Sequence, residues 1–180
     1  MFSAGKRPIL PLILALFAVA LLSREAGAQE APDLSGVWKM DASRSDSAHQ
    51  AVPIGPVTLM IQQNPGDISI ETRRAPRGKV AASVEKLSFT LDGAERPVTG
   101  SPGTVKVKGR RDGSKIITET TRNIDGSTVT TMHVFSLDAS GKELTIDKTL
   151  TVQHGYQFQG ANNTGRGKDV FIKRRGSLKK

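Results

Sequence analysis

Three histidines are the side chains of this sequence that could bind a metal ion or transfer a proton near neutral pH. His133 shares one face of a predicted strand with Phe135 and Leu137, so its ring can point inward. His154 ends another strand, and His49 lies in a polar loop. Their spacing does not match a zinc site, and the chain contains no cysteine. We therefore expect hydrogen-bonded or solvated histidines, no metal, no cofactor and no catalytic residue, in a protein that is not an enzyme.

Lys148 has an unusual position on its predicted strand. By the two-residue period it shares a face with Leu144, Ile146, Leu150 and Val152, although lysine is rarely buried without a partner. Its ammonium group can snorkel to the mouth of a barrel, bind an anionic head group in a cavity, or be turned outward by a local bulge. The pattern leaves these three alternatives open.

Aspartate–glycine pairs occur at Asp92-Gly93, Asp112-Gly113 and Asp125-Gly126. A calcium loop needs the spacing D-x-D-x-D-G, which the sequence lacks. Between segments of alternating polarity, Asp-Gly is instead a strong signal for a tight hairpin turn. These pairs therefore predict turns between antiparallel strands.

The segments between the turns alternate apolar and polar residues and are rich in Thr and Val, which favours strands. Strands are expected over 34–40, 57–62, 68–72, 86–91, 104–109, 114–122, 127–137, 143–153 and 168–174. A loop or short helical turn is expected over 41–51, and connections over 73–79, 95–103 and 155–167. The fold class is all-β: an antiparallel up-and-down meander of about eight to ten strands, closed into a barrel to hide its edges. A β-sandwich is the alternative.

The first 28 residues have the three parts of a secretory signal peptide. Lys6 and Arg7 are positive, residues 9–22 are apolar, and Ala26-Gly27-Ala28 is a small-residue cleavage site. The apolar run is shorter than the ~20 residues that span a bilayer, which disfavours the alternative of an uncleaved anchor. We expect residues 1–28 to be removed and 29–174 to form a single β-barrel domain, periplasmic or secreted, with no transmembrane segment in the mature chain.

The formal net charge of +9 is concentrated at the C-terminus. Residues 166–180 contain seven basic residues and one acidic residue, so the rest of the mature chain is nearly neutral. With few aromatic residues and no basic face, nucleic acid is not an expected partner. Residues 175–180 are expected to be a basic disordered tail, a solvated and frayed terminus. The alternative is that this tail contacts an anionic envelope surface, at about 1 kcal/mol per charge.

Gly36-Val37-Trp38, at the start of the first predicted strand, resembles the G-x-W motif of lipocalins. The wider opening, from Leu34 to Lys39 followed by Asp41 and Ser43, is similar to small exported bacterial lipocalin-like proteins, which are mostly uncharacterised. The resemblance implies that Trp38 plugs the closed end of the barrel, beneath a cation from the last strand, Lys173 or Arg174. A core aromatic is the alternative for Trp38. The chain departs from lipocalins in having no T-D-Y segment and no disulfide.

Two functions from different classes follow from a barrel of this kind. The first is binding of a small apolar or amphipathic ligand in the barrel interior by a monomer. The ligand-binding residues would be Trp38, Leu59, Ile61, Phe89, Val105, Phe135, Leu144, Ile146 and Lys148. The second is an envelope interaction or structural protein with a filled barrel and the basic tail as its contact. The interior volume discriminates between them.

Overall fold

The computed structural model describes residues 32–50, 54–99, 104–154 and 163–174. The predicted signal peptide, residues 1–28, and the predicted tail, residues 175–180, lie outside these described residues. Within them, no helix is long and apolar enough to cross a membrane.

Ten strands and two short 3-10 helices make up the described domain. The strands are β1 (Gly36–Met40), β2 (Val57–Gln63), β3 (Asp67–Arg74), β4 (Ser83–Thr90), β5 (Asp92–Thr99), β6 (Thr104–Asp112), β7 (Lys115–Ile124), β8 (Ser127–Leu137), β9 (Glu143–Gln153) and β10 (Asn163–Lys173). The helices η1 (Ala42–Arg44) and η2 (Asp46–Ala48) follow β1, where the sequence predicts a loop or a helical turn. The all-β prediction is confirmed.

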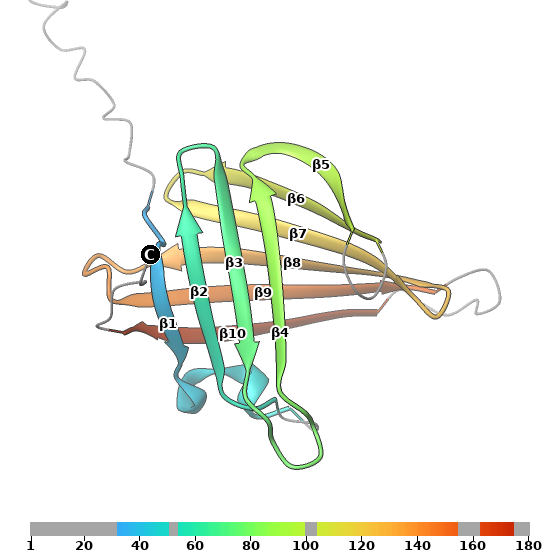
Figure 1. Cartoon of the computed structure of the whole chain (residues 1–180), viewed down its shortest axis with the longest axis horizontal. Helices are drawn as coiled ribbons and strands as arrows, with labels where there is room; N and C mark the ends of the chain where they lie inside the picture. The colour runs from blue at the N-terminus through green and yellow to red at the C-terminus, as the bar shows by residue number, and fades with distance from the viewer. Residues whose placement is uncertain (1–31, 51–53, 100–103, 155–162, 175–180) are drawn as a thin grey trace, which may run out of the picture. The chain divides into compact units, whose positions relative to one another are not determined.

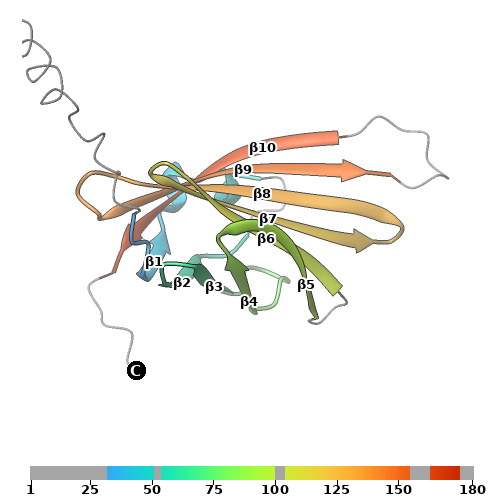
Figure 2. The same cartoon turned by 90° about the horizontal axis from the view of Figure 1, so that it is seen from above.

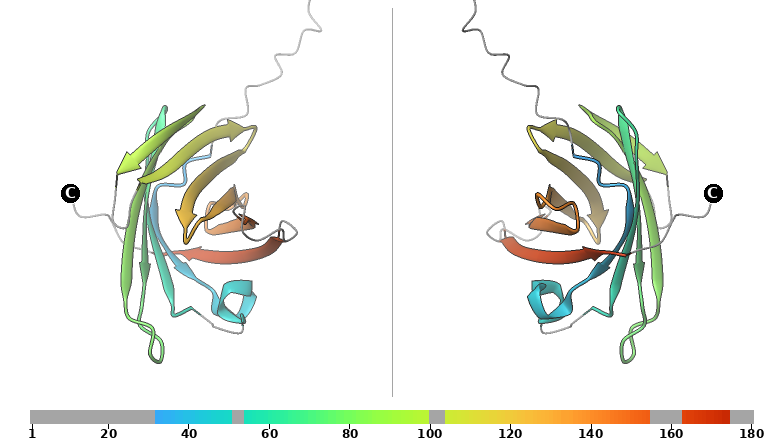
Figure 3. Two further views of the ribbon diagram at one scale, coloured as in Figure 1. Left: turned by 90° about the vertical axis from the view of Figure 1, so that its right-hand side faces the viewer. Right: turned by 90° about the vertical axis from the view of Figure 1, so that its left-hand side faces the viewer.

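The strands form one antiparallel sheet in which consecutive strands pair, except β4 and β5, and β1 also pairs with β10 (Figure 1). The sheet order begins at β4 and ends at β5, and it curls into a nearly closed barrel with these two edges facing each other (Figure 3). β7 to β10 extend beyond the shorter β1 to β4 (Figure 2). The up-and-down barrel is therefore confirmed, and the alternative of a two-sheet sandwich is wrong.

Two of the three predicted Asp-Gly turns are hairpin turns, whereas the prediction at Asp92-Gly93 is wrong: these residues begin β5, beside a register shift against β6, and β4 and β5 do not pair. Asp125 and Gly126 both have positive φ, 49° and 78°, the combination that a type I′ hairpin turn requires. Gly113 also has positive φ, 56°. The turns therefore fix the register of β6, β7 and β8, whose pairing is continuous from Lys106 onward.

Two predicted connections are wrong because they are strands. Residues 95–103 were expected to be a connection, yet Pro97 lies in β5 and is opposite Lys106 of β6. β5 is an edge strand, so the N–H that proline lacks can be missing on the side without a partner. Residues 163–167 were expected to be loop, but they begin β10 and pair throughout with β9. There the long partner strand outweighs the weak strand propensity of glycine and asparagine.

Trp38 is fully buried at one end of the barrel, which we call the base. Its indole Nε1 donates a hydrogen bond to the carbonyl of Leu34 at 2.8 Å, and the Lys173 ammonium lies 5.0 Å from its ring centroid. The expectation of a cation over Trp38 is confirmed, and the cation is Lys173. We call the opposite end of the barrel, where β3 ends at Arg74 and β7 ends at Ile124, the mouth.

Candidate functional site

A cavity of about 320 Å³ lies inside the barrel between the filled base and the mouth. Its apolar lining residues are Met40, Ile54, Val57, Leu59, Ile70, Leu87, Phe89, Ile124, Val129, Phe135, Ile146 and Phe171. Its polar lining residues are Ser47, Thr72, Arg74, Glu85, Thr118, Thr120, Arg122, Thr131, His133, Lys148 and Asp169. The interior is therefore amphipathic.

The polarity of the cavity wall changes abruptly along the strands. Ile116, Phe135 and Ile146 are directly opposite one another on β7, β8 and β9, and all three are buried. Two residues closer to the mouth, Thr118 is opposite His133, and His133 is opposite Lys148. We call these three side chains the polar rung. Because strand residues two apart face the same side, ~7 Å of strand separates the apolar row from the polar rung.

Lys148 has a counterion that the sequence reading missed. Its Nζ lies 2.6 Å from Oδ2 of Asp169, which is only 4% exposed, and also hydrogen-bonds to Ser47 Oγ. Ser47 donates to the same carboxylate from its backbone N–H at 3.0 Å and from its hydroxyl at 2.8 Å. β9 pairs without interruption through Lys148 with both neighbours, so the alternative of a local bulge is wrong.

Further hydrogen bonds attach the segment of η1 and η2 to β10. The Ser45 hydroxyl accepts a hydrogen bond from the Val170 N–H at 3.0 Å, and Asp46 accepts one from the Lys168 N–H at 2.7 Å. Asp41 accepts from the Ser43 N–H and caps the first of the two helices. Hydrogen bonds from small polar side chains therefore fix the position of Ser47 at the cavity.

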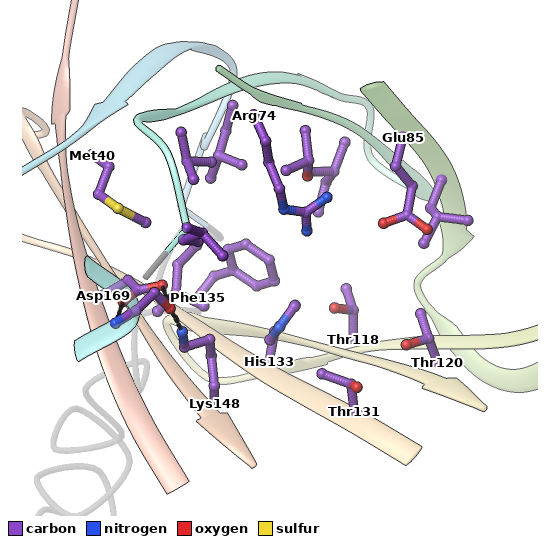
Figure 4. A pocket seen from close by; sticks show the side chains of 18 of the residues that line it. Met40, Arg74, Glu85, Thr118, Thr120, Thr131, His133, Phe135, Lys148 and Asp169 are labelled. Carbon is purple, nitrogen blue, oxygen red and sulfur yellow. Dashed lines mark hydrogen bonds and ion pairs between the residues drawn. The ribbon is translucent and has the colours of Figure 1, made fainter. Parts of the chain in front are cut away.

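A second ion pair lies nearer the mouth, between Arg122 and Glu85. Their side chains are 32% and 34% exposed, so the pair is partly solvated. Arg74 lines the same cavity, and among the described residues no carboxylate lies within ion-pair distance of it. Figure 4 shows its guanidinium group pointing into the cavity, across from His133. Of the three fixed cations in the cavity, Arg74 alone therefore lacks a carboxylate in the part of the chain that the structure describes.

His133 is uncharged in this environment at neutral pH. Burial, together with the nearby charges of Lys148 and Arg74, lowers the pKa of its imidazole to about 4, against the opposing charges of Asp169 and Glu85. Its ring packs edge-on against Phe135, with centroids 6.0 Å apart. We expected a hydrogen-bonded or solvated histidine; no described side chain or backbone group hydrogen-bonds to it, and its half-buried side chain lines the cavity.

The other two histidines are on the surface, as expected. His49 is exposed, and His154 Nδ1 lies 3.4 Å from the Ser127 hydroxyl in an exposed position. Across residues 32–50, 54–99, 104–154 and 163–174, no group of three acidic or imidazole side chains is arranged to hold a metal ion. The polar side chains that line the cavity therefore carry hydroxyl, imidazole and charged groups.

The predicted ligand-binding residues fall into two sets. Leu59, Phe89, Phe135, Ile146 and Lys148 line the cavity. Trp38, Ile61, Val105 and Leu144 are buried in the core and do not line it.

The sequence reading missed several cavity residues. Arg74 continues the alternation of Ile68, Ile70 and Thr72, but it was assigned to a connection. Asp169 was also missed. It lies two residues before Phe171 on a predicted strand, so the two-residue period puts its side chain on the same face as Phe171. That period was the signal that could have identified the partner of Lys148.

Comparison with known proteins gives likeness in structure alone. No protein-family model and no curated protein sequence matches the chain. A protein named REP1-NXSQ fatty acid transporter matches with a TM-score of 0.51 at 17% identity, over 82% of this chain and 100% of that chain. A secretory abundant heat soluble protein from Ramazzottius varieornatus matches with a TM-score of 0.51 at 14% identity, over 78% and 94%. Secretory abundant heat soluble protein 4 from the same organism gives 0.50 at 14% identity, over 81% and 97%.

None of these three neighbours is named as an enzyme. At such low identity the likeness shows the fold and nothing finer. The described domain therefore shares with these neighbours the fold of an antiparallel up-and-down β-barrel.

Proposed function

We propose that this chain is an exported, non-enzymatic binding protein that holds a small amphipathic ligand inside its barrel. The observation that carries the proposal is the cavity of about 320 Å³ with an apolar lower wall and polar groups nearer the mouth. A filled barrel, as the envelope-protein alternative supposed, would leave no such space. The fold shared with a protein named as a fatty acid transporter supports the same function.

The charges of the cavity favour a ligand with an acidic group. Asp169 is paired with Lys148, and Glu85 is paired with Arg122. Arg74 has no carboxylate beside it among the described side chains. A cation turned into a partly enclosed space loses hydration and gains from an anionic partner. The acidic group of the ligand would therefore bind Arg74 near the mouth, and its apolar part would point toward the base.

The volume sets the size of the enclosed ligand. A water molecule takes up about 30 Å³ in the liquid, so this cavity holds roughly ten groups of that size. A medium-chain carboxylate such as decanoate is a suitable probe. A much longer chain would have to extend through the mouth.

Export belongs to the proposal and rests on the sequence. Residues 1–28 have the pattern of a cleavable signal peptide, and Gly36-Val37-Trp38 resembles the opening of small exported bacterial lipocalin-like proteins. The first strand begins at Gly36, so cleavage after Ala28 would leave the barrel whole. The exported protein would then begin at Gln29 and be periplasmic or secreted.

Native mass spectrometry of the protein purified after export tests these points together. We expect a monomer whose denatured mass corresponds to residues 29–180, and a native mass that increases by one ligand. In calorimetric titration with decanoate, Arg74→Met should weaken binding by about 10- to 100-fold, because a charge-assisted hydrogen bond is lost. Arg73→Met is the matched control: Arg73 precedes Arg74 on β3, pairs with Glu71, and has a side chain that is 55% exposed.

A native mass without added ligand, combined with no heat of decanoate binding, would overturn the binding proposal. Equal losses in the Arg74 and Arg73 variants would keep ligand binding but remove the acid subsite. A mass that still includes residues 1–28 would contradict cleavage.

A further inference from the structure

We infer that Thr118 and His133 form a second polar subsite, which selects a ligand acid carrying a hydroxyl or oxo group close to its carboxylate. The inference rests on the proposed function and names the substrate class of the same cavity. It follows from the position of these two side chains, from their lack of partners, and from the apolar wall beneath them.

The two side chains are held side by side by the sheet. Thr118 of β7 is directly opposite His133 of β8 in the polar rung, and both line the cavity. The edge-on contact with Phe135 fixes the plane of the His133 ring. Figure 4 shows Thr118, His133 and Arg74 arranged around the same space. A ligand oxygen between Thr118 and His133 would therefore meet groups that are already oriented.

Neither side chain has a hydrogen-bond partner within the described part of the chain. Thr118 is only 2% exposed and His133 is half-buried, and the polar atoms of neither side chain are among the unpaired, solvent-inaccessible atoms of the described residues, so both open onto the cavity. A ligand oxygen placed there can hydrogen-bond to both, whereas an apolar ligand group would leave them without a partner at a cost in free energy. A neutral imidazole offers one donor and one acceptor, and a hydroxyl offers both. The pair can therefore bind either a hydroxyl or a carbonyl oxygen.

The ligand oxygen must lie near the acid group. Figure 4 shows the Arg74 guanidinium group pointing into the cavity across from His133, so the two groups face the same space. The next row toward the base is Ile116, Phe135 and Ile146, where an oxygen would have no partner. That row is ~7 Å from the polar rung along the strand. Only the first few carbons after the carboxylate can thus present an oxygen to Thr118 and His133.

Three probes of the same chain length separate the alternatives: decanoate, 3-hydroxydecanoate and 10-hydroxydecanoate. With wild-type protein we expect 3-hydroxydecanoate to bind about tenfold more tightly than decanoate, as one good hydrogen bond provides. We expect 10-hydroxydecanoate to bind more weakly than decanoate, because its terminal hydroxyl would be buried against Phe135 and Phe171. Calorimetric titration at pH 7.5 gives all three affinities.

Variants assign the selectivity to this subsite. Thr118→Val keeps the shape but removes the hydroxyl, so the preference for 3-hydroxydecanoate over decanoate, with both affinities measured on the variant, should fall to about threefold or less. Thr118→Ser retains a hydroxyl and should retain the preference, which covers the case in which the valine variant does not fold. Thr121→Val is the matched control, because Thr121 lies on the same strand, faces the opposite side, and pairs with the Thr130 hydroxyl at 3.2 Å.

Each outcome decides one question. If decanoate binds and wild-type protein does not distinguish it from 3-hydroxydecanoate, the second subsite is wrong and the binding function stands. If the preference exists but survives Thr118→Val unchanged, the oxygen is bound elsewhere and the assignment is overturned. If none of the three acids binds, the proposed function itself fails.

Discussion

Asp169 is the residue on which the charge balance of the cavity depends. Its carboxylate is buried and accepts hydrogen bonds from the Ser47 backbone, the Ser47 hydroxyl and Lys148. A buried ion pair contributes little net stability when both partners are present, because desolvation offsets the attraction. Removing one partner is different, since the remaining charge stays in the cavity without compensation. The pair therefore specifies the arrangement of η2, β9 and β10 more than it adds to stability.

Asp169→Asn should destabilise the domain by roughly 2–4 kcal/mol, below the limit for a fully buried pair because the Lys148 side chain is 22% exposed. The double variant with Lys148→Met should recover a large part of that loss, because the uncompensated charge is gone. Urea unfolding at pH 7.5 measures both. Losses that simply add would show that the two residues do not interact.

A surface pair provides the comparison for this cycle. Lys106 and Glu95 are 2.9 Å apart, with side chains 59% and 48% exposed. Exposed pairs contribute about 0–1 kcal/mol, so Lys106→Met with Glu95→Gln should cost little and show almost no coupling. A coupling as large as that of the cavity pair would contradict the role of burial.

At the scale of elements, the seam between β4 and β6 completes the barrel. β4 and β5 are the two edges of the sheet, and the end of β4 packs against β6 at Gly109. A Cβ atom at Gly109 would lie 2.8 Å from the Thr90 carbonyl oxygen and 2.9 Å from Phe89 Cβ, closer than real Cβ atoms approach. Only glycine lets the two strands come this close together.

Gly109→Ala should therefore destabilise the domain by about 1–3 kcal/mol, because backbone atoms must move apart along the seam. Gly66→Ala is the control, since a Cβ there would have nothing within 4 Å. The two variants are compared by thermal and urea unfolding. A Gly109 variant as stable as the Gly66 variant would mean that the seam adjusts freely.

The elements also show what sequence reading can achieve here. Strands that alternate and are joined by an Asp-Gly pair, such as β7 and β8, were predicted well, because period and turn chemistry agree in them. β5 was missed because Pro97 argues against a strand unless the strand lies at an edge, and edge position is a property of the whole sheet. The first residues of β10 were missed because only pairing with β9 makes Gly165 and Gly167 extended.

The cavity was less predictable than the fold, for a physical reason. Lys148 was singled out because a lysine on an apolar face conflicts with the local pattern. Its partner Asp169 is 21 residues away in the chain, and Ser47 is 101 residues away. Assigning Arg74 to the cavity required knowing that β3 extends two residues beyond Thr72, so that both side chains face the same side. Such groups meet only when the barrel closes, so residue spacing alone could not bring them together.

For the whole molecule, the lowered pKa values of the carboxylates and of His133 all favour instability in acid. The pKa of Asp33 is lowered by hydrogen bonds from Ser35, and hydrogen bonds from Ser140 and from the backbone of Glu143 and Lys142 together lower the pKa of Asp138 to about 2. Stability from these carboxylates is complete above their unfolded pKa of about 3.9 and is lost as the pH falls below it. His133 acts in a different pH window, because its pKa is about 4 in the folded domain and about 6.5 in the unfolded chain.

The sign of the histidine contribution follows from proton binding. Above about pH 6.5 the imidazole is neutral in both states, and stability is unaffected. Between pH 6.5 and about 4 the unfolded chain binds a proton that the folded domain does not, so stability falls as the pH falls. Below about 4 both states are protonated and the loss is complete. The histidine and the carboxylates thus destabilise the domain in successive windows.

We therefore expect the free energy of unfolding of the ligand-free domain to fall by roughly 2 kcal/mol between pH 7 and pH 4.5, because one buried imidazole must be charged. His133→Gln keeps a hydrogen-bonding side chain that does not titrate, and its stability should be nearly constant over this range. His154→Gln, at the exposed histidine, should retain the wild-type slope. Urea unfolding at half-unit pH intervals measures the three profiles. A His133→Gln profile as steep as the wild-type one would show that the acid sensitivity of the barrel arises outside the cavity.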